Sequence, residues 1–172
     1  MTWIQTYTGK QFYPLEPRAE DIDIADIAHA LSLICRFTGH CRVFYSVAEH
    51  SLLMSEWCKP ELAKWALMHD AAEAYLADVA RPVKRQIPHY CDYERAVLLQ
   101  VSKRFGLPWP VPLEIGYLDR RMLATECRDL MSQPPNPWGA TEGIEPFARS
   151  ILPCNWIHIE SKFLARFDEL FP

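Results

Sequence analysis

Four ionisable residues lie at positions where hydrophobic neighbours predominate: His50, the adjacent pair His69 and Asp70, and Asp119. An imidazole or carboxylate that faces a protein core must be neutralised, hydrogen-bonded or coordinated, because its unpaired burial is costly. One shared divalent cation would satisfy all four side chains. Two imidazoles and two carboxylates suit Mn²⁺, Fe²⁺, Co²⁺, Ni²⁺ or Zn²⁺ better than Mg²⁺ or Ca²⁺, which favour oxygen ligands. We therefore expect one divalent transition-metal ion here, and the ligand types leave its identity open.

A fifth residue, Glu73, follows His69 by four positions and Asp70 by three. On a helix these spacings place the side chains on one face, about one turn apart. A carboxylate that lies close to a metal-bound water without coordinating the ion can take or give the proton that hydrolysis requires. The spacing therefore indicates Glu73 as a general acid or base.

Each of these residues also has an ordinary interpretation. A single histidine on an apolar helix face is more often a hydrogen-bonded core residue than a ligand, and Glu73 alone could be a solvated surface charge. The combination of a His, an adjacent His-Asp pair and a later Asp on separate helices favours a common site.

The elements that must position these residues are mainly helical. Apolar residues recur at steps of three and four, and Asp23 is suited to cap the start of the first helix. The segment from Thr6 to Pro17 favours an extended arm or short hairpin. The sequence thus predicts an all-α, compact single domain over residues 1–172, with about six or more helices and a short extended N-terminal arm. The predicted helices cover about 24–34, 47–57, 62–76, 89–104, 113–131 and 156–171.

Composition limits the function classes. The chain has 172 residues, a formal net charge of −4, 49% hydrophobic and 23% charged residues, which is typical of one globular domain and not of a disordered or fibrous chain. The negative balance disfavours a nucleic-acid polymer as partner. No apolar run is long enough to predict a membrane span, and no secretion signal begins the chain, so we expect a cytoplasmic protein. The six cysteines are scattered, and we assign them no disulfide and no metal.

The surroundings of the four candidate ligands resemble the HD-domain metal-dependent phosphohydrolases, a helical superfamily. Within it, the motifs are similar to the bacterial deoxynucleoside 5′-monophosphatases, and the opening of the chain is similar to small phage and prophage HD phosphohydrolases, some of which hydrolyse deoxynucleoside triphosphates. The resemblance covers about residues 5–131 and leaves the tail from Pro134 unmatched. It rests on Arg36-Phe37, Val47 to Ser51, Ala66 to Glu73, Asp78, Arg81 to Lys84, and Asp119 to Glu126.

The resemblance implies a role for each matched residue. His50, His69, Asp70 and Asp119 would hold the metal, and Glu73 and Asp78 would be catalytic. Arg36 and Lys84 would hold phosphate oxygens, and Asp78 would also lie near the sugar hydroxyl. Phe37 stands where the monophosphatases have Trp, which keeps an apolar wall beside the sugar but removes the indole N–H.

The resemblance implies a small-molecule nucleotide substrate and in-line attack of water on phosphorus, assisted by the metal. We expect 5′-dephosphorylation of deoxyribonucleoside monophosphates. Two alternatives stay open: a deoxynucleoside triphosphate triphosphohydrolase, and a non-catalytic HD-fold protein that binds a partner. Related HD enzymes assemble, so we also expect a homo-oligomer. Trp109 and Trp138 are compatible with an interface or with the rim of a pocket.

Overall fold

The N-terminal arm is a hairpin that closes one end of the molecule. In this computed structural model, which describes residues 2–172, strands β1 (Ile4–Gln5) and β2 (Gln11–Phe12) pair antiparallel. Gly9, at a φ of +84°, forms the tight turn between them. Asp26 accepts hydrogen bonds from the backbone N–H and the hydroxyl of Thr8, at 2.6 and 3.0 Å. These bonds attach the arm to the first helix.

Helices make up most of the remaining chain, and the predicted all-α class with a short extended arm is confirmed. Each long helix has an apolar face, and three begin at a residue whose side chain accepts a backbone N–H: Asp23, Ser46 and Asn155. The helices are α1 (Ile24–Leu33), α2 (Val47–Trp57), α3 (Ala63–Met68), α4 (Glu73–Leu76), α5 (Arg81–Lys84), α6 (Tyr90–Phe105), α7 (Leu113–Leu130) and α8 (Trp156–Leu170), with 3-10 turns η1 (Ala19–Asp21), η2 (Arg36–Gly39), η3 (Pro60–Leu62) and η4 (Gly139–Thr141).

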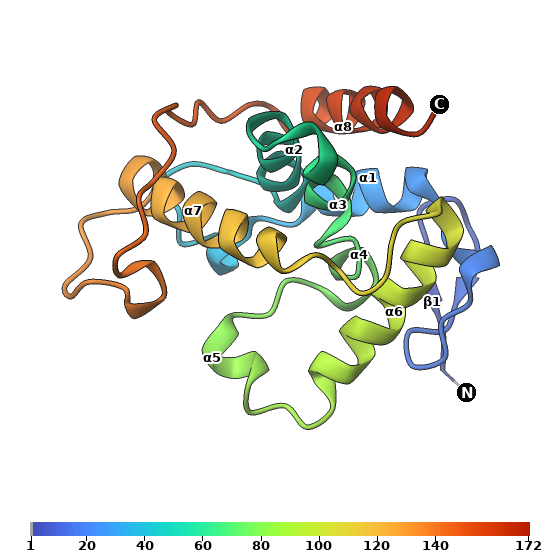
Figure 1. Ribbon diagram of the computed structural model, residues 1–172. Helices are drawn as coiled ribbons and strands as arrows, with labels where there is room; N and C mark the ends of the chain where they lie inside the picture. Colours follow the sequence, from blue (N-terminus) through green and yellow to red (C-terminus); the bar gives the residue numbers. More distant parts are fainter. Residues whose placement is uncertain (1) are drawn as a thin grey trace.

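Helix α2 lies at the centre of the bundle. It packs against α1, α3, α7 and α8, and α8 in turn covers α1 at the C-terminal end of the chain (Figure 1). The buried side chains form one cluster that extends from Phe12 in the hairpin to Phe167 in α8. A polar residue on the inner face of α2 is therefore surrounded by protein and has to find its partners there.

The predicted helix over 62–76 is wrong in one respect, because the chain leaves regular α-helix at residues 69–72. His69 and Ala72 keep helical backbone angles, but the N–H groups of Ala71 and Glu73 bond to carbonyls three residues earlier, Met68 and Asp70. Such tighter i to i+3 bonding is typical of functional breaks within helices. His69 and Asp70 therefore lie in the turn between α3 and α4, and not on the same regular helix as Glu73.

Within residues 2–172, no helix has both the length and the apolar character needed to cross a membrane.

Candidate metal centre

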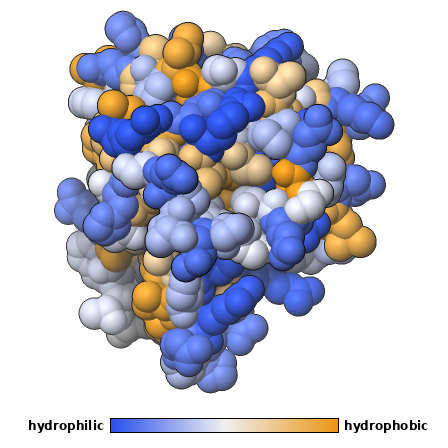
Figure 2. All heavy atoms as spheres, turned by 90° about the vertical axis from the view of Figure 1, so that its left-hand side faces the viewer, coloured by the Kyte–Doolittle hydropathy of each residue, from blue (hydrophilic) through white to orange (hydrophobic). Residues whose placement is uncertain are grey.

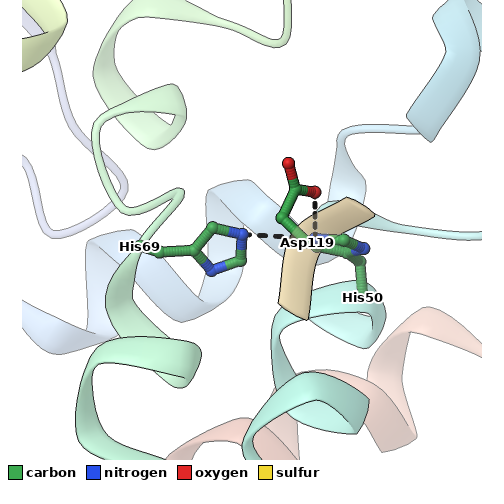
Figure 3. Close-up of side chains that lie close together, drawn as sticks. All are labelled: His50, His69 and Asp119. Atoms are coloured by element: carbon green, nitrogen blue, oxygen red, sulfur yellow. Dashed lines mark hydrogen bonds and ion pairs between the residues drawn. The ribbon is translucent and has the colours of Figure 1, made fainter. Parts of the chain in front are cut away.

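Three separate parts of the chain bring the predicted ligands together. His50 projects from α2, His69 and Asp70 come from the turn before α4, and Asp119 comes from α7. The imidazoles of His50 and His69 and the Asp119 carboxylate converge on one point (Figure 3). His50 is completely buried, whereas Asp70 and Asp119 retain some exposure toward a pocket.

The distances suit a single ion. His50 Nε2 lies 3.2 Å from His69 Nε2, 3.6 Å from Asp119 Oδ1 and 3.7 Å from Asp70 Oδ2. His69 Nε2 lies 3.2 Å from the same Asp70 oxygen. Metal–ligand bonds of about 2.0–2.2 Å place neighbouring ligand atoms roughly 3–3.5 Å apart. His50, His69 and Asp119 thus form a possible metal-binding group, and Asp70 Oδ2 lies beside its two imidazoles but outside the group.

The hydrogen bonds of the two histidines indicate how their rings are oriented. His69 Nδ1 lies 2.9 Å from the carbonyl oxygen of Ala66, and His50 Nδ1 lies 2.7 Å from Oε1 of Glu126. Both partners are acceptors, so each Nδ1 carries a proton, and each ring turns its Nε2 toward the other. Carboxylate oxygens lie beside these nitrogens. A metal ion or a bound proton would satisfy the two Nε2 atoms, while Arg36 and Arg81 lie 3.8 and 3.5 Å from the carboxylates of Asp70 and Asp119.

The neighbouring charges also shift the pKa values of Asp70 and His69. Burial alone would raise the pKa of Asp70, but the imidazoles of His69 and His50 and the Arg36 guanidinium hold it far below its ordinary value. Burial would lower the pKa of His69, yet Asp70 raises it overall. The carboxylate is thus ionised and the cluster attracts positive charge.

Glu126 is a site residue that the sequence prediction did not assign. Its carboxylate is fully buried on α7, where Oε1 accepts from His50 and Oε2 accepts from Arg36 Nη2 at 2.9 Å. Burial opposes its ionisation, but Arg36 and His50 lower its pKa to about 2. Glu126 therefore fixes the ring of a candidate ligand and the guanidinium of a candidate phosphate-binding residue at once. The sequence feature that could have identified Glu126 is its position seven residues after Asp119, on the same face of the helix.

Arg36 begins a strained segment. Phe37 and Thr38 have φ values of 56° and 53°, and Gly39 follows at 80°. Left-handed backbone is rare for a bulky or β-branched residue, and it persists only where the surroundings impose it. Arg36 N–H bonds to the Tyr45 carbonyl at 2.9 Å, which holds the start of the segment. The contacts that impose this backbone also hold the Arg36-Phe37 pair at the edge of the site.

We expect Thr38→Gly to stabilise the protein by about 1 kcal/mol, or roughly 2–4 °C in Tm, because glycine adopts this backbone without steric cost. Differential scanning calorimetry measures the change. Thr38→Ala is the matched control, since it removes the hydroxyl and methyl groups but keeps the Cβ that causes the strain. A Tm for Thr38→Gly equal to or below that of Thr38→Ala contradicts the assignment of strain.

The remaining predicted residues surround a pocket of about 1140 Å³. Its charged lining residues include Arg36, Asp70, Glu73, Asp78, Lys84 and Asp119. Figure 2 faces the side of the molecule that carries α5 and the chain after α7, and it shows mainly hydrophilic side chains with hydrophobic atoms visible between them. The structure thus gathers every sequence-predicted site residue at or behind one pocket.

Glu73 and Lys84 differ in whether their polar atoms have partners within the protein. Oε2 of Glu73 is buried without a hydrogen-bond partner, and burial together with the Asp70 and Asp78 carboxylates raises the pKa of Glu73 well above its ordinary value. Burial also raises the pKa of Asp78. Lys84 Nζ lies 2.6 Å from Glu94 and 3.8 Å from Glu73, so its charge is already partly compensated.

Comparison with known proteins shows the family to which this chain belongs. No protein-family model matches the chain. The chain is 42% identical to the uncharacterized protein YfdR of Escherichia coli (strain K12) over 173 residues, which cover 99% of this chain and 96% of that protein. The chain belongs to the YfdR family. An uncharacterized protein of Rhodobacter capsulatus is 38% identical over 123 residues, which cover 66% of this chain and 63% of that protein. The names of these two relatives state no activity.

Proposed function

We propose that this chain is a metal-dependent phosphohydrolase of the HD superfamily that acts on nucleotides and removes the 5′-phosphate of deoxyribonucleoside monophosphates. One observation carries the proposal: the possible metal-binding group of His50, His69 and Asp119 lies behind a pocket that Asp70, Asp119 and Arg36 line. A phosphate group fits such a place, because its oxygens can bind a metal ion and an arginine together.

The donor set fits one divalent transition-metal ion held by His50, His69, Asp70 and Asp119. Such an ion, when bound, would polarise a phosphoryl oxygen or activate the attacking water. Which of Mn²⁺, Fe²⁺, Co²⁺, Ni²⁺ or Zn²⁺ serves is decided by metal titration of the purified protein and not by the ligand types.

The protein side chains supply the rest of the chemistry. Arg36 holds phosphate oxygens and offsets the negative charge that develops during in-line attack. Lys84, which is paired with Glu94, assists Arg36 in holding the phosphate oxygens. Glu73 moves a proton at its unpartnered oxygen Oε2, and Asp78 orients the water and the sugar hydroxyl. Phe37 places an apolar ring beside the sugar, where a ribose 2′-hydroxyl would lack a partner.

A triphosphate substrate is the second candidate. Arg81, Arg85 and Arg120 also line the pocket, and these cations could hold further phosphate groups. The alternative that the chain is a non-catalytic partner-binding protein predicts no turnover at all. Assembly into a homo-oligomer stays a prediction.

The deciding experiment supplies each divalent metal in turn and follows phosphorus products from deoxynucleoside mono- and triphosphates. We expect inorganic phosphate from the monophosphate, with kcat/KM roughly 5- to 150-fold above that for the matching ribonucleotide, the cost of burying an unpaired hydroxyl. His69→Ala is the inactive control. Tripolyphosphate release would establish the triphosphate reaction instead, and no release with any metal would favour the partner-binding alternative.

A further inference from the structure

The pocket has a second wall, built by the chain that follows α7. This segment, residues 131–147, is fixed to the helix that carries Asp119. Arg121 Nε donates to the carbonyl of Glu145 at 3.1 Å, and Thr125 Oγ1 accepts from the N–H of Phe147 at 2.9 Å. Arg128 Nη1 donates to the carbonyl of Phe147 at 2.9 Å. The wall is therefore held in a defined position relative to the candidate metal centre.

An aromatic pair marks the point where this wall meets the strained segment. The rings of Phe37 and Trp138, which are a hundred residues apart in the chain, lie 5.8 Å apart at an angle of 46°. Both residues line the pocket and both are only partly buried. Leu123, Met131 and Ile144 line the pocket as well. The pocket lining thus includes an aromatic and apolar group in addition to its charged residues.

Arg36 lies between the charged residues and this aromatic group. Its Nη1 lies 3.8 Å from Oδ2 of Asp70, and its guanidinium carbon lies 5.3 Å from the centre of the Phe37 ring. Phe37 in turn contacts Trp138. The rest of a molecule whose phosphate group is held by Arg36 would therefore be within reach of Phe37 and Trp138.

We propose that Trp138, with Phe37 at its edge, is the platform on which the nucleobase of the substrate stacks. This inference rests on the proposed function, because it takes the charged residues of the pocket as the phosphate site. The two rings already contact each other, so the base stacks on their pocket side and does not insert between them. Stacking uses the face that every base presents, so the platform accepts purines and pyrimidines alike.

The test compares two ligands that differ only in the base: deoxyadenosine 5′-monophosphate and 2-deoxyribose 5-phosphate. Binding is measured by calorimetry with metal present, in a Glu73→Gln background that slows consumption of the ligand by about 10²-fold or more. Trp138→Leu keeps an apolar side chain that can pack against Phe37 but removes the ring. We expect it to weaken binding of the nucleotide by roughly 5- to 150-fold, the range for loss of base stacking, and to leave 2-deoxyribose 5-phosphate unchanged.

Two further variants complete the test. Trp138→Phe retains a ring and should recover most of the nucleotide affinity. Trp3→Ala removes an exposed tryptophan of the N-terminal arm and should change neither ligand. Equal weakening of both ligands by Trp138→Leu, or no weakening of either, overturns the platform. So does failure of the nucleotide to bind.

The experiments distinguish failure of the proposed phosphohydrolase function from failure of the base platform. If deoxyadenosine 5′-monophosphate binds in a manner that depends on the Trp138 ring, yet the unmutated protein hydrolyses no nucleotide with any divalent metal, the platform stands and the phosphohydrolase does not. If the nucleotide is hydrolysed and Trp138→Leu has no base-dependent effect, the platform is overturned and the phosphohydrolase stands.

Discussion

Glu73→Gln should lower kcat for nucleotide hydrolysis by a factor of about 10² or more while the protein keeps its metal, because it removes a general acid or base and leaves the four ligands in place. The substitution preserves the size of a side chain that is almost fully buried at the start of α4. Steady-state kinetics of the metal-loaded protein, with metal content measured on the same sample by mass spectrometry, separate the two effects.

The matched control for this substitution is Glu114→Gln, which neutralises an exposed carboxylate in the first turn of α7, outside the pocket. Its kcat should lie within about two-fold of that of the unmutated protein, since an exposed charge far from the pocket has little effect on the reaction there. If Glu73→Gln releases the metal, Glu73 is a ligand and the proton-transfer role assigned to it is wrong.

Glu126→Gln should weaken metal binding by about 10- to 100-fold, although Glu126 would not touch the ion. Its carboxylate accepts from both His50 and Arg36, and an amide can offer its single oxygen to only one of them. If the amide N–H₂ turns toward His50, it favours the tautomer with the proton on Nε2, which cannot bind a metal. Competition with a chromogenic chelator measures the change in Kd.

A second histidine–glutamate pair provides the control for Glu126. His29 and Glu160 lie 3.2 Å apart between α1 and α8, away from the pocket. Glu160→Gln makes the same chemical change there, and we expect no change in metal affinity. Equal affinities for Glu126→Gln and the unmutated protein would show that Glu126 does not set the tautomer of His50.

The long helices could be predicted from the sequence because each has a continuous apolar face and a clear boundary. The predicted and observed ends of the helices that begin at Ile24, Val47 and Leu113 agree within one residue. The short helix α5 could not be predicted, because four residues are too few to show a helical period. The break at residues 69–72 was also hidden, because the apolar spacing continues through it and nothing in the residue types opposes a helix.

The candidate site was predictable to a similar degree and for a similar reason. The metal-binding group was indicated because His50, His69 and Asp119 each interrupt an apolar face, which is a local property of the sequence. Glu126 interrupts the same face of α7, but its partners lie on α2 and in η2. Only the tertiary packing of these elements shows that its carboxylate serves His50 and Arg36 together. Trp138 lies outside the resemblance, so its position in the pocket also required the structure.

The order of the ligands along the chain has a consequence for biosynthesis. His50 and His69 precede Asp119, which lies on α7. While the chain is being translated, a nascent segment that ends before α7 contains two imidazoles and one carboxylate but no complete cluster. A metal ion that used all of these ligands would therefore find its complete site only after α7 has been synthesised and has packed against α2.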